Sequence, residues 1–574
     1  MDIVEKSRAS ANAWLNDPVI DASTKSEVSD MLHHTDSKLL VDSFYKDLEF
    51  GTGGLRGIMG AGSNCVNRYT IGKATQGLAN YLKRSFPAAP VKVAIAFDSR
   101  NRSKELAHVT ASVFSANGIE VHIFEALRPT PLLSFAIRYL GCQSGVVITA
   151  SHNPKEYNGY KAYWTDGAQL IPPHDEAVIN EVNAITSFDM IKFKADEDKI
   201  FTISSELEDA YYKQVAAAVP SLEIIRKHND IPIVFSGLHG TGSTMVPECL
   251  SRLGFTNCIT VAEQAQPDGS FPTVASPNPE EQSAMQMALQ LAKEKNAELV
   301  MATDPDADRV GIGIKDSKGD FFLLNGNQAF SLMIWFILRN LERNDRHYIA
   351  KTIVTTELVD EMAKYFGVTC YNTLTGFKYI AALINELEDT KTFIAAGEES
   401  YGYMVGDFVR DKDAVSACAF FAAMAAAAKD EKKTLFDWLV EIYQEHGFYK
   451  EGLVNVVRKG ADGAREIKEL MTQFRTSPPV SFNNEKVVRA LDYQAQIEKD
   501  LISGTQKEII LPASDVLQFY TEKGTKISVR PSGTEPKIKF YISVSDKLSS
   551  PDEYELKNRE LDFRIESIKK QLIT

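Results

Sequence analysis

GVVITASHNP, residues 145–154, joins a run of apolar residues to a serine, a histidine and a proline. The apolar run 145–150 predicts a short buried strand, and Pro154 ends regular structure soon after it. We therefore expect Ser151 on the loop that leaves the carboxyl end of a strand, which is where open α/β sheets bind ligands. A serine presented there can act as a nucleophile, although the segment alone also fits an ordinary turn.

Similar apolar segments recur along the chain, and each ends in a polar or glycine-rich loop. They are VKVAIAFD (91–98), IPIVFSGLHG (231–240), ELVMATD (298–304) and TFIAAGEES (392–400). Helical patterns separate them, and this alternation is typical of parallel α/β sheets. Because the pattern recurs, it favours repeated α/β units over one large sheet.

The segment DPDADR, residues 304–309, lies between two apolar strands. Two carboxylates about 5 Å apart repel by roughly 3 kcal/mol at an effective dielectric constant near 20, so a cation is needed to hold them together. Oxygen ligands on a short loop suit Mg²⁺. An EF-hand calcium loop is one alternative, but this segment lacks the glycine and the distal glutamate at the positions that the EF-hand motif requires. A solvated acidic turn is the other alternative.

RPSGTEPK, residues 530–537, lies between two alternating strands near the end of the chain. The backbone N–H groups and hydroxyls of its Ser-Gly-Thr turn can converge on one anion, with Arg530 and Lys537 beside them. An ordinary hairpin turn is the alternative. The fourth segment, AAGEESYGY at 395–403, follows another apolar strand, and its polar side chains can bind sugar hydroxyls.

Taken together, the four segments resemble the signatures of the α-D-phosphohexomutases, the family that contains phosphoglucomutase and phosphomannomutase. TASHNP, DPDADR, GEES and RPSGTEPK each occur once, in the family's order, and the resemblance covers essentially the whole chain. Smaller matches are GTGGLRG (51–57), FDSR (97–100), TGFKY (375–379) and RDKD (410–413).

The resemblance implies an α/β fold with three similar α/β/α domains and a smaller C-terminal α+β domain around a central cleft. The expected domains are 1–205 with the phosphoserine loop, 206–320 with the metal loop, 321–446 with the sugar-binding loop and 447–574 with the phosphate-binding loop.

The resemblance also implies that Ser151 is phosphorylated in the active enzyme. The phosphoserine would give its phosphoryl group to a sugar monophosphate, and the resulting hexose 1,6-bisphosphate would reorient and return the other phosphate. Asp304, Asp306 and Asp308 would bind Mg²⁺ together with an oxygen on Ser151. Arg309 would contact the same phosphate, or else pair with the acidic loop.

Lys161 and Lys412 match the family's general acid/base positions. A lysine can act as a base only if its pKa falls, and burial with nearby cations such as Arg56 or Arg410 would lower it. Arg56 itself matches an active-site arginine. His152 is expected to orient or hydrogen-bond the phosphate rather than act as the base, because successive residues of an extended loop tend to point apart.

Substrate contacts are expected from three loops. Glu398 and Ser400 resemble the ligands of the sugar hydroxyls, and Thr375 and Gly376 lie in the loop that reads the orientation of the sugar. The remaining expected substrate-binding residues are Arg410, Arg530, Ser532, Gly533 and Thr534. His239 is expected to have a structural role in its loop.

Composition agrees with a cytoplasmic enzyme. The chain has 574 residues with a net charge of −14, which argues against a nucleic-acid partner because phosphate backbones bind basic surfaces. Six cysteines without C-x-x-C spacing indicate reduced thiols. Residues 1–14 are expected to form a charged amphipathic helix, and they lack the apolar core of a signal peptide. The apolar stretch 414–428 is too short to span a bilayer, so it predicts a buried helix capped by Asp413.

The sequence therefore predicts a phosphohexomutase that interconverts sugar 1-phosphate and sugar 6-phosphate, with glucose as the expected sugar and glucose 1,6-bisphosphate as activator and intermediate. The expected partners are small sugar phosphates, with no nucleic acid and no membrane. A phosphopentomutase or a sugar-bisphosphate synthase of the same family is one alternative. A non-catalytic phosphosugar-binding protein is an alternative of another class.

Overall fold

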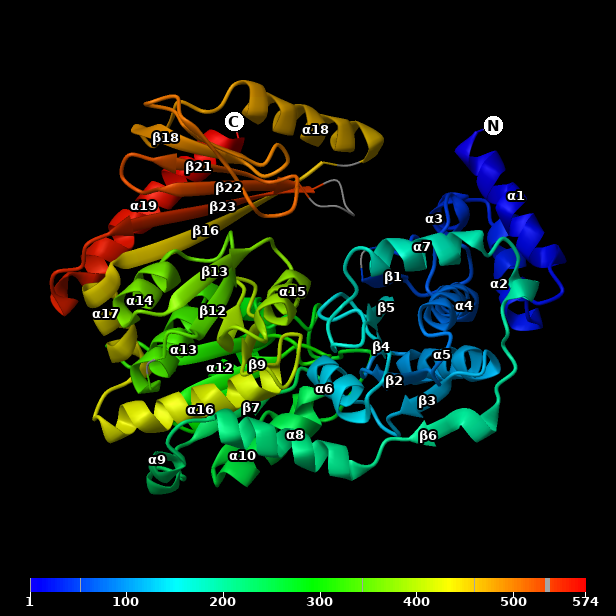
Figure 1. The fold of residues 1–574 in the computed structure, drawn as a ribbon, viewed down its shortest axis with the longest axis horizontal. Helices are drawn as coiled ribbons and strands as arrows, with labels where there is room; N and C mark the ends of the chain where they lie inside the picture. The colour runs from blue at the N-terminus through cyan, green and yellow to red at the C-terminus, as the bar shows by residue number, and fades with distance from the viewer. Residues whose placement is uncertain (1, 52, 343, 459, 532–536, 574) are drawn as a thin grey trace.

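The computed structural model describes residues 2–51, 53–342, 344–458, 460–531 and 537–573. Figure 1 shows four sheets that follow one another along the chain. Strands and helices alternate in the first three, whereas the fourth is built mainly of antiparallel strands. The predicted α/β class, with three α/β/α domains and a C-terminal α+β domain, is confirmed.

The first sheet has the strand order β1-β5-β4-β2-β3-β6. Its central strands β2 and β4 are almost entirely buried, as is typical where helices cover both faces of a sheet. The strands are β1 (Gly54–Ile58), β2 (Lys92–Phe97), β3 (Glu120–Ile123), β4 (Ser144–Ile148), β5 (Tyr157–Tyr163) and β6 (Ile200–Thr202). The helices are α4 (Arg68–Ser85), α5 (Ser103–Ala116), α6 (Thr130–Leu140) and α7 (His174–Ala184). Because β4 ends at Ile148, Ser151 lies at the carboxyl edge of the sheet.

The second sheet has the order β11-β10-β9-β7-β8. Its strands are β7 (Ile233–Ser236), β8 (Cys258–Thr260), β9 (Leu299–Thr303), β10 (Val310–Lys315) and β11 (Phe321–Leu324). Its helices include α8 (Ser205–Ala218), α9 (Leu222–Lys227), α10 (Gly242–Leu253) and α12 (Gln282–Glu294). β9 and β10 are antiparallel, so the acidic segment 304–309 is the turn of a hairpin. β11 extends this sheet past the boundary expected at residue 320.

The third sheet has the order β13-β12-β14-β15. Its strands are β12 (His347–Thr352), β13 (Thr369–Thr373), β14 (Thr392–Gly397) and β15 (Tyr403–Val405). Its helices are α13 (Gly326–Asn340), α14 (Leu358–Phe366), α15 (Phe377–Leu387), α16 (Ala414–Asp430) and α17 (Leu435–His446). Glu398 directly follows β14, so this sheet also delivers a polar loop at a strand end.

The fourth sheet runs β16-β23-β22-β21-β18-β19-β20, and α18 (Gly460–Thr476) and α19 (Tyr554–Ile573) accompany it. Its strands are β16 (Phe448–Val457), β18 (Glu485–Asp492), β19 (Ile497–Asp500), β20 (Gln506–Glu508), β21 (Leu517–Thr521), β22 (Lys526–Pro531) and β23 (Lys537–Asp546), and β17 (Ser481–Phe482) pairs with β18. β22 and β23 form the hairpin expected around the Ser-Gly-Thr turn.

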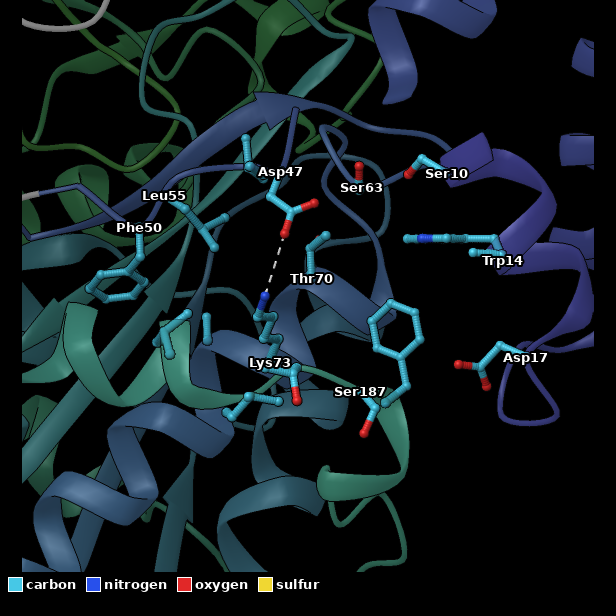
Figure 2. A pocket seen from close by; sticks show the side chains of 17 residues that line it. Ser10, Trp14, Asp17, Asp47, Phe50, Leu55, Ser63, Thr70, Lys73 and Ser187 are labelled. Atoms are coloured by element: carbon cyan, nitrogen blue, oxygen red, sulfur yellow. Dashed lines mark ion pairs between the residues drawn. The ribbon is translucent and has the colours of Figure 1, made fainter. Parts of the chain in front are cut away.

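The N-terminal helices α1 (Ile3–Asn16), α2 (Ala22–His33) and α3 (Lys38–Phe44) pack beside the first sheet. Between α1 and α4 lies a cavity of about 250 Å³. Figure 2 shows Trp14 and Ser10 lining it from α1, and Lys73 reaching from α4 toward Asp47. The nitrogen–oxygen distance of that ion pair is 3.6 Å.

α16 is buried along nearly all its length, as expected for the apolar stretch 414–428. Asp413 caps it, because its carboxylate accepts from the backbone N–H groups of Val415 and Ser416 at 3.0 and 3.1 Å. The Tyr211 hydroxyl donates to the same carboxylate at 2.8 Å. Within the described ranges, no helix has both the length and the apolar character needed to cross a membrane. All six cysteines are free thiols.

We expect Asp413→Ala to destabilise the protein by about 3 kcal/mol. A lost N-cap costs about 1 kcal/mol, and a hydroxyl left buried without its acceptor costs roughly 1–3 kcal/mol more. Thr434→Ala is the matched control, because Thr434 caps the adjacent helix α17 through an exposed hydrogen bond. Thermal unfolding should show a larger drop in Tm for Asp413→Ala, and equal drops would contradict the role of the buried cap.

Candidate active site

Ser151 adopts a left-handed backbone conformation with φ of 51°. Its side chain is buried, and its Oγ donates to Asp304 Oδ2 at 2.6 Å. His152 Nδ1 lies 3.2 Å from the same Oγ. The expectation that these neighbouring side chains point apart is therefore wrong, because the chain between them is a tight turn rather than an extended strand. Burial and the charges of Arg309 and Arg56 hold the pKa of His152 well below 6.5, so a neutral imidazole faces the serine.

Three buried carboxylates lie close together beside Ser151. Oxygens of Asp304, Asp306 and Asp308 lie within 4.8 Å of one another. The Oδ1 atoms of Asp306 and Asp308 are buried and have no hydrogen-bond partner in the described part of the chain. Burial and the two neighbouring charges raise the pKa of Asp304 well above 3.8. Three buried carboxylates at this spacing, two of which keep an oxygen without a hydrogen bond, fit a divalent cation such as Mg²⁺.

The turn between β9 and β10 fixes the cluster. Asp304 Oδ1 accepts from the backbone N–H groups of Asp308 and Arg309 at 3.1 and 3.0 Å. Thr130, at the start of α6, donates to Asp306 Oδ2 at 2.8 Å, which ties the turn to the first domain. A hairpin between two strands is not the helix–loop–helix of an EF-hand, so that alternative is excluded.

Two lysines neutralise the carboxylates. Lys161 Nζ lies 2.7 Å from Asp306 Oδ2 and 3.1 Å from Asp308 Oδ2. Lys412 Nζ lies 2.9 Å from Asp411 Oδ1 and 3.4 Å from Asp308 Oδ2. Burial lowers the pKa of each lysine, but the carboxylates raise it more, so both pKa values exceed the usual 10.5. The prediction that the lysine pKa values fall is therefore wrong for the chain without a metal, where both side chains are ammonium groups.

Two arginines lie near the serine loop. Arg309 hydrogen-bonds Glu280, and its Nε lies 3.8 Å from Asp308 Oδ1. Arg56 is on β1, and its Nη1 donates to Asn153 Oδ1 at 3.1 Å. Arg309 therefore pairs with acidic neighbours, and its contact with the phosphate stays a prediction.

A cavity of about 880 Å³ adjoins these groups. It lies within the range of roughly 300–1,000 Å³ that is usual for small-molecule sites. All four domains line it, as expected for a central cleft: His152 comes from the first, Arg309 from the second, Glu398 from the third and Arg530 from the fourth.

The third domain contributes two joined loops. The backbone N–H of Gly376 donates to Glu398 Oε1 at 2.9 Å. Thr375, Gly376, Glu398 and Ser400 all line the cavity, so the structure brings together the residues expected to contact the sugar. Lys378, which sequence reasoning missed, lines it two residues after Gly376.

The fourth domain contributes positive charge. Arg530 on β22 lies opposite Lys539 on β23 in the strand register, and both line the cavity with Lys537 and Tyr541. Lys539 was not predicted, although residues 537, 539 and 541 alternate on one strand and therefore share a face. Burial and the charge of Lys537 lower the pKa of Lys539. Ser532, Gly533 and Thr534 lie outside the described residues, so their role stays a prediction.

Arg410 is buried behind the cavity lining, and its contact with substrate stays a prediction. Its guanidinium is buried 3.6 Å from Asp407 Oδ2 and 3.4 Å from Asn385 Oδ1. Its backbone N–H donates to Ser134 Oγ at 2.8 Å.

His239 is held inside the second domain. Its Nδ1 lies 3.2 Å from the carbonyl oxygen of Gln266, and its Nε2 lies 2.8 Å from Thr273 Oγ1. These contacts brace the loop 264–273, which agrees with the structural role expected from the sequence.

Comparisons with known proteins agree with this geometry. Models of the phosphoglucomutase/phosphomannomutase α/β/α domains I, II and III match residues 47–189, 209–319 and 325–446. Curated phosphoglucomutases are similar along most of the chain. One from Staphylococcus epidermidis is 37% identical over 530 residues, 92% of this chain and 96% of that protein. One from Staphylococcus aureus is 37% identical over 506 residues, 88% and 90% of the two chains.

Solved structures share the fold. A putative phosphomannomutase from Thermus thermophilus has a TM-score of 0.67 at 19% identity, covering 92% of this chain and 99% of that one. The parafusin (phosphoglucomutase) of Paramecium has a TM-score of 0.69 at 18% identity, covering 92% and 94%. The matched domain models and the curated relatives establish that the chain belongs to the phosphoglucomutase/phosphomannomutase family of α-D-phosphohexomutases.

Proposed function

We propose that this enzyme interconverts glucose 1-phosphate and glucose 6-phosphate through a phosphorylated Ser151. The observation that carries the proposal is the 2.6 Å contact of Ser151 Oγ with Asp304, inside a carboxylate cluster and beside a cavity lined by all four domains. The name phosphoglucomutase, carried by the similar Staphylococcus proteins, supports glucose as the sugar.

The reaction proceeds in two in-line transfers. First the bond between phosphorus and Ser151 Oγ breaks, a bond to the free sugar hydroxyl forms, and the hydroxyl proton ends on Oγ. The product, glucose 1,6-bisphosphate, turns round and returns its other phosphoryl group to Oγ, and the proton goes back to the sugar oxygen. Because the site is the same in both steps, one geometry serves both.

Residues around Ser151 hold the transferred group. Mg²⁺ bound by Asp304, Asp306 and Asp308 with a phosphoserine oxygen would offset the negative charge on this group. Lys161 and Lys412 donate to its oxygens as ammonium groups. Arg309 and His152 bind it from the cavity side, and Arg56 binds it from beside Asn153. Phosphoryl transfer has a loose transition state in which positioning and charge dominate, so raised lysine pKa values are compatible with it.

The other end of the substrate is held without reacting. Glu398 and Ser400 bind adjacent hydroxyls, and Thr375 and Gly376 contact the sugar from the neighbouring loop. Arg530, Lys537 and Lys539 attract the second phosphate, and residues 532–534 are predicted to bind it with them. The cavity thus has an end that reacts and an end that only binds.

The two alternatives differ in how much of the site they would use. A phosphosugar-binding protein needs neither a serine buried against three carboxylates nor a metal. A phosphopentomutase or a bisphosphate synthase would use the same centre, and substrate preference separates it from a glucose enzyme. Free thiols agree with a cytoplasmic location, which is also part of the proposal.

Ser151→Ala should reduce turnover by about 1,000-fold or more because it removes the group that carries the phosphoryl. Sugar-phosphate binding should remain measurable by calorimetry. Mass spectrometry of the active enzyme should find phosphate on the peptide containing residues 145–154. Ser112→Ala, on the exposed side of α5, is the control. An active Ser151→Ala enzyme would refute the mechanism.

Asp306→Asn should lower kcat by about 100-fold or more while changing the affinity for sugar phosphate little, since the cluster acts mainly on the group in transfer. The Mg²⁺ concentration for half-maximal activity should rise. Asp316→Asn, in the exposed turn between β10 and β11, is the matched control. Full activity of the wild-type enzyme in excess chelator would contradict the metal site.

Glucose 1-phosphate should exceed ribose 1-phosphate in kcat/KM by about tenfold or more. A site that pairs with a hydroxyl discriminates against a sugar that lacks it, and a pentose is one carbon too short to span Glu398 and Arg530. Both substrates should be assayed at one concentration of glucose 1,6-bisphosphate. Equal values, or a higher value for ribose 1-phosphate, would favour the phosphopentomutase alternative.

A further inference from the structure

The loop that carries Ser151 is held from behind by one buried arginine. Arg100 follows β2, and its side chain is fully buried. Its guanidinium donates to backbone carbonyl oxygens of Ser151 at 2.5 Å, Pro154 at 2.9 Å and Tyr157 at 3.1 Å, and also to that of Asn153. The planar fork of an arginine can serve four acceptors at fixed angles, which a lysine cannot do.

Asp98 links this arginine to the backbone of Ser151 by a second route. Its Oδ2 lies 3.4 Å from Arg100 Nε and accepts from Thr149 Oγ1 at 2.6 Å. Thr149 Oγ1 in turn accepts from the backbone N–H of Ser151 at 2.8 Å. Ser103 donates to the other oxygen of Asp98 at 2.7 Å, so the carboxylate itself is fixed. The N–H and the carbonyl of Ser151 are therefore both bound to one ion pair.

The hydrogen bonds to the N–H and to the carbonyl of Ser151 stabilise its strained backbone conformation. A left-handed backbone is unfavourable for a residue other than glycine and persists only where the surroundings hold it. The φ of 51° brings Ser151 Oγ to Asp304 and His152. If the loop relaxed to an extended conformation, Oγ would leave the carboxylate cluster.

Arg100 also contacts the second domain. Its guanidinium lies 5.1 Å from the ring centre of Phe271, and its backbone bridges to Gly269. A Cβ added at Gly269 would lie 2.2 Å from the backbone nitrogen of Asn101, so only glycine fits this approach. Phe271 and Gly269 belong to the loop that His239 braces, so the serine loop is set against the domain that supplies the aspartates.

We propose that the Asp98–Arg100 pair is a positioning device that sets the backbone of Ser151 and aims its Oγ at the carboxylate cluster. Neither residue lines the central cavity, so the pair acts through Ser151 and not on the sugar. The inference rests on the proposed role of Ser151 as the phosphoryl carrier.

Arg100→Lys tests the proposal because it keeps the charge opposite Asp98 but removes the fork. We expect kcat to fall by about 100-fold, since a displacement of about 1 Å at a reacting group has an effect of this size. The Kd of the unphosphorylated enzyme for glucose 6-phosphate should stay within twofold. Hydrogen exchange should become faster in the peptide 149–158 and stay unchanged in the third and fourth domains.

Arg102→Lys is the matched control, because Arg102 lies two residues further on and pairs only on the surface with Glu105. Thr149→Val breaks the second route with little change in volume, and it keeps the test decisive if Arg100→Lys does not fold. It should reproduce the loss of kcat and the faster exchange.

A folded Arg100→Lys or Thr149→Val enzyme with wild-type kcat would overturn the proposal, as would a lower Tm with unchanged kcat per folded molecule. The proposed function fails separately, if the wild-type enzyme carries no phosphate on Ser151. In that case the exchange of peptide 149–158 still shows whether the pair holds the loop.

Discussion

Mutual repulsion among the buried carboxylates of Asp304, Asp306 and Asp308 is the constraint on which the site depends. Three such groups cannot share one small volume unless positive charge or protons compensate them. In the chain alone, Lys161 and Lys412 approach from the first and third domains, and the pKa of Asp304 is raised. One oxygen each of Asp306 and Asp308 still accepts no hydrogen bond in the described part of the chain, and Asp304 contacts Ser151.

The fold meets this constraint by bringing strand ends together. The serine loop follows β4, the aspartate turn follows β9 and the glutamate loop follows β14, so three α/β units deliver polar residues to one cavity. The antiparallel fourth sheet adds Arg530, Lys537 and Lys539 to the lining of the same cavity. An anionic substrate is thus attracted by local cations although the whole chain carries a charge of −14.

The sequence was sufficient for the strands, the fold class and the cluster around Ser151, because apolar runs followed by polar loops are local patterns. It failed where contacts between distant segments decide. The lysine pKa values rise because Asp306, Asp308 and Asp411 lie next to the ammonium groups. The position of His152 depends on the backbone angle at Ser151. Lys539 was missed, although it alternates with Lys537 and Tyr541 on a strand that the sequence predicts.

The central claim is that Ser151 and the three aspartates form one metal-dependent phosphoryl-transfer centre. Anomalous diffraction from crystals of the phosphorylated enzyme grown with Mn²⁺ in place of Mg²⁺ tests it most directly, because both ions favour six oxygen ligands. We predict a single strong anomalous peak coordinated by Asp304, Asp306, Asp308 and a phosphate oxygen on Ser151. A peak elsewhere, or an enzyme that turns over with no metal at these carboxylates, would contradict the claim.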